Sequence, residues 1–296
     1  TKPAMVITVA GNLLNIGLNY VLIYGKLGFP ALGLNGAGWA TLIARIVMLL
    51  AMLVLVATQE PFKKYWTGIW QRTRNKVVAK RLVQVGIPTG LQMIFEVGAF
   101  AFAALMTGWI SPEAQAAHNI AISLASVSYM VASGLSAAAT VRVGNQLGRK
   151  DIANLKQAAW VSYILVGAFM VFSGVVFLLG KDVLPTLYIN EPEVVSIASS
   201  LLVIAVMFQL SDGIQAVGLA ALRGLTDVRI PTWITFLVYW AFALPASYVL
   251  GFTFELGPEG IWYGLALGLT LSAVLLGWRF KYRVTELAQK REFKRK

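Results

Sequence analysis

Residues 157–179 read QAAWVSYILVGAFMVFSGVVFLL, an uncharged segment that lies between Lys156 and Lys181. A helix of this length extends about 34 Å, at 1.5 Å per residue, and covers the hydrocarbon core of a bilayer, which is about 30 Å thick. A segment so long and so apolar has no place on the surface of a water-soluble domain. The stretch therefore predicts a membrane-spanning helix.

The rest of the chain follows the same pattern. Of its 296 residues 58% are hydrophobic and only 13% are charged, whereas soluble domains carry roughly 25% charged residues. The mean hydropathy is +0.71. We predict an all-α polytopic membrane protein with eight transmembrane helices, near residues 3–25, 33–57, 82–108, 114–141, 157–179, 196–220, 231–253 and 259–280.

Rare residue types exclude several kinds of chemistry. The chain has no cysteine, which removes disulfides, thiolate zinc sites, iron–sulfur clusters and cysteine nucleophiles. Its one histidine, His118, leaves no pair of histidines for a metal. We expect no cofactor and no metal site beyond a place for Na⁺.

The basic residues alternate between the two sides of the predicted helices. Counting along the chain, 22 of the 25 Lys and Arg residues fall in segments on one side, among them Arg223 and Arg229, and only Lys26 and Lys181 fall on the other. Cytoplasmic loops are enriched in Lys and Arg, so we expect both ends of the chain in the cytoplasm. The net charge of +12 then reflects membrane topology and anionic lipid headgroups, not nucleic acid.

The first two helices resemble the last two. Pro3 matches Pro231 and Tyr20 to Leu22 match Tyr248 to Leu250 at an offset of 228, and Gly36 matches Gly260 at 224. Parallel repeats of this kind are common in transporters. If each repeat has six helices, the first lacks its opening four, and we expect a longer chain of about 456 residues, twice the offset.

This repeat predicts the organisation of the chain. The last two helices of a first six-helix lobe precede a basic cytoplasmic linker, a complete second six-helix lobe and a basic cytoplasmic tail. The expected bounds are 1–57, 58–81, 82–282 and 283–296.

Two acidic residues lie within the predicted helices. Glu96 is at the centre of the third and Asp212 lies roughly 6 Å to the cytoplasmic side of the centre of the sixth. Burying such a carboxylate costs about 2.5 to 3.5 kcal/mol even on the lenient insertion scale, and residues of this kind usually act on ions or substrates. Polar side chains that accompany them in sequence are Gln92, Gln209, Ser211 and Gln215.

Carboxylate and amide oxygens suit a hard cation such as Na⁺, and a carboxylate in a low-dielectric site can carry a proton instead. Arg45 falls near the middle of its own helix and offers another interpretation, a silent ion pair with one of the two acids. One arginine cannot neutralise both acids, so we favour a role in ion or substrate binding. We keep Arg45 as a candidate partner.

Three other features favour structural roles or stay undecided. Pro88 and Pro245 predict kinks that serve as hinges, line a cavity or are merely tolerated. The stripe Gly260, Gly264 and Gly268 predicts close helix packing. His118 is expected to be a satisfied histidine near the outer interface.

Several motifs together resemble one family. They are FEV at 95–97, AAHNIA at 116–121, RVGNQLGR at 142–149, QLSDG at 209–213 and ALRGLTD at 221–227. In order and spacing they are similar to the NorM-like branch of the multidrug and toxic compound extrusion (MATE) family. The resemblance covers the whole chain, from the fifth family helix to the twelfth.

The resemblance implies a twelve-helix transporter of two lobes in the bacterial inner membrane. Such a protein exports organic cations and amphipathic drugs in exchange for Na⁺ or H⁺, and we expect it to be monomeric. Glu96 and Asp212 would be the cation-binding acids of the second lobe. Phe208 stands where the family often has Tyr, which removes one hydroxyl, although its ring can still face a cation. Without the missing helices of the first lobe the substrate cavity is incomplete.

Two alternatives belong to other classes. A lipid-linked oligosaccharide flippase usually lines its cavity with several basic residues, and only Arg45 is available. A membrane-embedded enzyme acting on lipids needs clustered acids for Mg²⁺ or a histidine with Ser or Thr. No two acids adjoin in any predicted helix, so we do not expect an enzyme.

Overall fold

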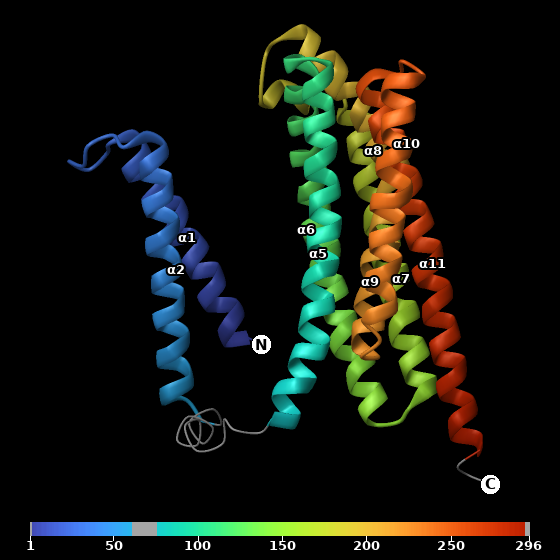
Figure 1. Cartoon of the computed structure of the whole chain (residues 1–296). Coiled ribbons are helices and arrows are strands. Elements are labelled where there is room, and N and C mark those ends of the chain that lie inside the picture. The colour runs from blue at the N-terminus through green and yellow to red at the C-terminus, as the bar shows by residue number, and fades with distance from the viewer. Residues whose placement is uncertain (1, 61–75, 294–296) are drawn as a thin grey trace. The chain divides into compact units, whose positions relative to one another are not determined.

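The computed structural model describes residues 2–60 and 76–293, and all regular secondary structure within these segments is helical. Within them, eight helices are long and apolar enough to cross a membrane, which confirms the predicted fold class. With the labels of Figure 1, the helical elements are α1 (Lys2–Tyr24), α2 (Gly33–Thr58), α5 (Lys76–Ile110), α6 (Pro112–Gly148), α7 (Ile152–Gly180), η1 (Pro185–Leu187), α8 (Pro192–Gly224), α9 (Arg229–Phe236), η2 (Leu237–Ala243), α10 (Leu244–Tyr248), η3 (Val249–Thr253) and α11 (Gly257–Phe293).

Several helices extend beyond the predicted apolar spans. α6 continues to Gly148 and α8 to Gly224, where 141 and 220 were expected, because a helix does not end where the hydrocarbon core ends. Ser111 begins α6 by accepting a hydrogen bond from the Ala114 amide, and Asp151 begins α7 in the same way through Asn154.

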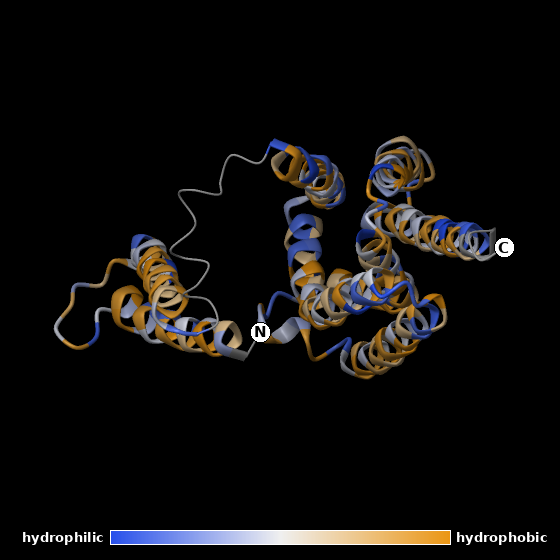
Figure 2. Cartoon of the chain, turned by 90° about the horizontal axis from the view of Figure 1, so that it is seen from below, coloured by the Kyte–Doolittle hydropathy of each residue, from blue (hydrophilic) through white to orange (hydrophobic). Residues whose placement is uncertain are grey.

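The chain forms two compact units, residues Thr1–Ala79 and Lys80–Lys296. The first contains the hairpin of α1 and α2, and the second contains a bundle in which α6, α7 and α11 all pack against α8. Most of the predicted basic linker falls on residues 61–75, which lie outside the described residues. Figure 2 shows hydrophobic residues over the outer sides of the helices as well as between them, as a bilayer requires.

The predicted repeat has a counterpart in atomic contacts. In the first hairpin the Leu32 amide donates to the Leu22 carbonyl at 2.9 Å, and in the last hairpin the Leu256 amide donates to the Leu250 carbonyl at 3.2 Å. A Cβ added to Gly36 would lie 2.5 Å from the Leu22 oxygen, and one added to Gly260 would lie 2.6 Å from the Leu250 oxygen. The same glycine contact therefore closes both hairpins.

The glycine stripe of α11 is a packing face, as predicted. Added Cβ atoms at Gly264 and Gly268 would collide with Ser247 and Ala243. These partners belong to the segment that contains Pro245, where α10 lies between the wider turns of η2 and η3. Helix α5, in contrast, continues through Pro88.

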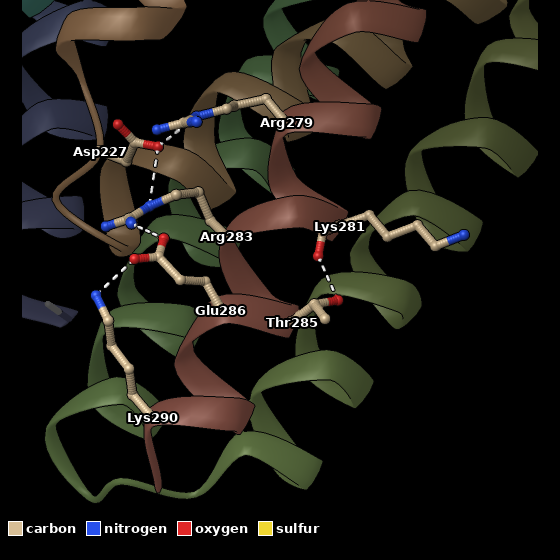
Figure 3. A network of polar contacts seen from close by, with 7 residues as sticks. All are labelled: Asp227, Arg279, Lys281, Arg283, Thr285, Glu286 and Lys290. Atoms are coloured by element: carbon tan, nitrogen blue, oxygen red, sulfur yellow. Dashed lines mark hydrogen bonds and ion pairs between the residues drawn. The ribbon is translucent and has the colours of Figure 1, made fainter. Parts of the chain in front are cut away.

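An ionic network fixes the C-terminal half of α11 (Figure 3). Asp227, just after α8, accepts from Arg279 Nε at 2.8 Å and lies 3.2 Å from Arg283 Nε. Glu286 contacts both Arg283 and Lys290. The Asp227 carboxylate is only 10% exposed, so these pairs are screened less than ordinary surface pairs.

The shared glycine contact predicts a matched pair of effects on stability. We expect Gly36→Ala and Gly260→Ala each to lower the free energy of unfolding by about 1–3 kcal/mol, because the added methyl group displaces a backbone carbonyl. Gly38, two residues from Gly36, has open space around it, so Gly38→Ala should not destabilise the protein. Thermal unfolding in detergent, followed by tryptophan fluorescence, measures all three. Equal midpoints for Gly36→Ala and Gly38→Ala would contradict the proposed contact.

Candidate cation site

The two membrane-embedded carboxylates lie in one pocket of the second unit. Glu96 comes from α5 and Asp212 from α8, and both are half-buried. The pocket has a volume of about 210 Å³. Its lining residues are Met93, Glu96, Val97, Phe100, Ile122, Ala125, Ser126, Tyr129, Phe208 and Asp212.

Local packing turns Asp212 toward this pocket. On the adjacent position, Gly213, an added Cβ would lie 2.6 Å from Val166 Cγ1 and 2.7 Å from Met170 Cγ, both on α7. Only glycine allows α7 to approach α8 so closely. Phe208, one turn before Asp212, lies on the same side of α8 and also lines the pocket.

Glu96 is held by a chain of hydrogen bonds. Gln215 Nε2 donates to Glu96 Oε1 at 3.0 Å, and Tyr239 Oη donates to Gln215 Oε1 at 3.0 Å. Because an ionised carboxylate only accepts, the amide NH₂ of Gln215 points at Glu96, and the amide oxygen is left to accept from the phenol. Gln215 and Tyr239 are both fully buried, so α5, α8 and η2 are joined by well-defined polar contacts.

A second polar chain involves Gln92 and Arg223. Arg223 Nη2 donates to Gln92 Oε1 at 3.0 Å, and Gln92 Nε2 donates to Thr235 Oγ1 at 3.4 Å. The prediction that Arg223 belongs to a loop is wrong. Arg223 lies in the last turn of α8 because this helix continues to Gly224, and the side chain is half-buried.

The helical period relates Arg223 to Asp212. They are eleven residues apart, three turns of helix, which corresponds to about 16 Å along the axis on one face of α8. The sequence already shows this relation, because positions 212, 215, 219 and 223 follow one another at intervals of three or four residues and so share one face of a helix. Within the described residues, neither Glu96 nor Asp212 forms an ion pair with this arginine or with another basic residue.

Like Gln92 and Gln215, two other predicted residues are not among those that line the pocket. Gln209 Nε2 donates to Ser128 Oγ at 3.1 Å, and the Ser211 hydroxyl pairs with Thr270 on α11 at 3.1 Å. Neither lines the pocket. Arg45 belongs to α2 in the first unit, and its pairing with either acid stays a prediction.

Three aromatic and hydroxyl residues at the site were not predicted. Tyr129 and Ser126 of α6 line the pocket, and Tyr239 supports Gln215 from behind. Uncharged polar residues are common in transmembrane helices, so the sequence offers little to single them out. Tyr129 places a phenol hydroxyl in the pocket, whereas Phe208 has no hydroxyl.

His118 lies inside the bundle. It is 1% exposed, and its Nδ1 accepts from Trp262 Nε1 at 3.0 Å. Trp262 in turn packs on Phe208, with ring centroids 5.6 Å apart. The hydrogen bond satisfies the imidazole, as expected, and Trp262 connects it to the pocket wall at Phe208. The level of His118 relative to the membrane surface stays a prediction.

The pocket can accept a cation through oxygen atoms. No three His, Asp or Glu side chains come together within the described ranges, so the ligands on offer are two carboxylates and nearby hydroxyl groups. Oxygen-only surroundings suit Na⁺ or a proton and do not suit a soft metal. A drug-sized ligand usually needs about 300 to 1,000 Å³, more than this pocket provides alone.

Comparison with known proteins gives one consistent result. Residues 88–249 match the MatE family. The chain is 35% identical over 287 residues to the probable multidrug resistance protein NorM of Xylella fastidiosa, covering 95% of this chain and 60% of that protein. It is 40% identical over 293 residues to the multidrug resistance protein MdtK of Yersinia enterocolitica, covering 95% and 63% respectively. The chain thus spans about 60% of the length of these relatives.

Solved structures agree on the fold. A MATE protein crystallised in the bent conformation superposes with a TM-score of 0.83 at 20% identity, covering 98% of this chain and 63% of that one. The eukaryotic MATE transporter AtDTX14 gives a TM-score of 0.80 at 22% identity, with 96% and 64% covered. The family match includes the membrane-embedded carboxylates and most of the second unit. The chain therefore belongs to the MatE family of multidrug and toxic compound extrusion proteins.

Proposed function

We propose that this chain forms the C-terminal part of an antiporter that exports amphipathic organic cations in exchange for Na⁺ or H⁺. The observation that carries the proposal is the shared pocket of Glu96 and Asp212, two acids on different membrane-spanning helices. The names of the NorM and MdtK relatives support drug export as the direction of the activity.

The electrostatics of the pocket explain why transport would be coupled. Two carboxylates in a low-dielectric site repel each other, so at least one is most stable with a bound cation or proton. An organic cation that approaches the same carboxylates competes with that ion. Exchange follows because occupation by one cation lowers the affinity for the other, and this coupling is reciprocal.

The hydrogen-bond chain from Tyr239 gives the pocket a fixed shape. Gln215 holds one oxygen of Glu96 and leaves the other oxygen without a hydrogen-bond partner among the described residues. A preformed oxygen ligand reduces the ordering cost of binding a small ion. Glu96 is thus the fixed ligand, and Asp212 lines the same pocket.

The remaining helices of the first lobe would complete the substrate cavity. A pocket of about 210 Å³ holds an ion, or the charged end of an amphipathic cation, but not a whole drug. We therefore propose that four further helices precede this chain in the active protein and supply the opposite wall. The longer protein is expected to act as a monomer in the inner membrane.

Neutralising either acid should abolish coupled efflux by the longer protein. We expect Glu96→Gln and Asp212→Asn each to reduce ion-dependent efflux of a fluorescent organic cation at least tenfold, because the neutral side chain no longer attracts the competing cations. Efflux from inverted vesicles, with an imposed Na⁺ or proton gradient, measures the effect.

The matched control is Glu193→Gln, an exposed acid in the first turn of α8, which should leave efflux unchanged. All variants should be present in the membrane in equal amounts, judged by an antibody to the C-terminal tail. Undiminished efflux in both pocket variants would refute the assignment.

The predicted orientation can be tested without removing native thiols, since the chain has no cysteine. We expect Lys181→Cys to react with a membrane-impermeant maleimide from the outer side, and Lys150→Cys to react only after the membrane is opened. The reason is the enrichment of Lys and Arg in the segments on the Lys150 side. The opposite pattern of labelling would contradict cytoplasmic termini.

A further inference from the structure

A second pocket, which shares no lining residue with the carboxylate pocket, lies in the groove between α6 and α7. Its volume is about 440 Å³. Close to the turn that joins the two helices it is lined by Arg142 and Gln146 of α6 and by Asn154 and Gln157 of α7. Further from the turn its walls are mostly aliphatic, with Leu135, Val161 and Leu165 beside Ser162, whose hydroxyl donates to the Ala158 carbonyl.

The polarity of the groove changes in one direction. Leu135 and Arg142 lie on the same face of α6, seven residues apart, which is about 10 Å along the helix. On α7 the same change runs from Gln157 to Leu165 over a similar length. The groove therefore offers a polar end near the turn and an apolar end toward the middle of the membrane.

Other residues place the polar end at the membrane surface. Trp160 on α7 is 65% exposed, and exposed tryptophans gather at the level of lipid headgroups. The turn that follows α6 carries Arg149 and Lys150. The Asp151 carboxylate accepts from the Asn154 amide at 3.1 Å and from Asn154 Nδ2 at 2.7 Å, and basic residues outnumber it here.

Arg142 is available to a ligand. The side chain is exposed, and within the described residues it takes part in no ion pair. A guanidinium group binds phosphate through two parallel hydrogen bonds, and the amides of Gln146 and Gln157 can donate to further phosphate oxygens.

We infer that this groove is a binding site for one anionic phospholipid. The phosphodiester lies at Arg142, Gln146 and Gln157, and the first part of an acyl chain lies along Leu135, Val161 and Leu165. The groove matches such a lipid in charge and in length. An anionic phospholipid has a negatively charged end in the headgroup layer and an apolar end in the hydrocarbon core. An organic cation does not fit this description, because Arg142 repels it.

The inference does not depend on the proposed transport function. The groove contains neither Glu96 nor Asp212, so a lipid could bind here whether or not those acids bind a cation. An occupant of this groove would contact α6 and α7 together and would stabilise their hairpin.

Native mass spectrometry of the purified protein in mild detergent tests the site. We expect phosphatidylglycerol to bind more tightly than phosphatidylcholine with the same acyl chains. Arg142→Gln should weaken phosphatidylglycerol binding about fivefold, the effect of one basic residue near a membrane surface, and should remove the preference. Arg149→Gln, which changes a basic residue outside the pocket lining, should keep it.

A second variant examines the apolar end. Val161 is 45% exposed, so Val161→Trp should fill the groove without disturbing the core and should reduce phosphatidylglycerol binding while the unfolding midpoint stays unchanged. Equal binding of the two lipids by the unmodified protein, or an unaltered preference in Arg142→Gln, would overturn the inference. Inorganic phosphate that displaces the lipid at equal concentration would also overturn it, because the site would then recognise a free anion.

Discussion

The structure of the second unit is organised around the placement of two carboxylates inside the membrane. Each would cost several kcal/mol if left alone in hydrocarbon, so the helices around them must supply polar contacts. Gln215 and Tyr239 supply a buried chain of hydrogen bonds to Glu96. Gly213 lets α7 pack closely behind Asp212, so that this acid lines the same pocket. What remains unsatisfied is the negative charge itself, and this is the property on which the proposed exchange of cations depends.

Within each of the two units, neighbouring helices are joined by contacts that need very small residues. The Gly36 and Gly260 contacts to backbone carbonyls recur in two hairpins that are far apart in sequence, and the stripe on α11 continues the second of them. Between helices in a bilayer the hydrophobic effect contributes little, so close van der Waals packing has to hold them together. The ionic network around Asp227 adds polar contacts in the C-terminal half of α11. The α6–α7 groove is likewise polar at one end and apolar at the other, as expected for a groove that extends from the headgroup layer into the hydrocarbon core.

Much of this arrangement could be predicted from the sequence, because a membrane constrains the length and polarity of each helix. Apolar runs predicted the eight spans, and the cost of charge in the membrane singled out Glu96 and Asp212 before their shared pocket was known. The partners of these acids were harder to identify. Tyr239 and Tyr129 come from other helices, and which face of a helix meets which neighbour depends on packing that one sequence does not reveal. Arg223 was misplaced because hydropathy marks the end of an apolar run, whereas the helix continues until its last turn is capped. The burial of His118 was not predicted for a related reason, since its partner Trp262 comes from α11.

The central claim is that a coupling ion and an organic cation compete for Glu96 and Asp212. Equilibrium binding of tetraphenylphosphonium to the purified longer protein, measured over a range of Na⁺ concentration and pH, tests it most directly. The account predicts that Na⁺ or protons weaken binding competitively in the unmodified protein, and that this dependence disappears when both acids are neutralised together. The same dependence on Na⁺ and pH in the doubly neutralised protein would contradict the account, because the competing ion would then bind elsewhere.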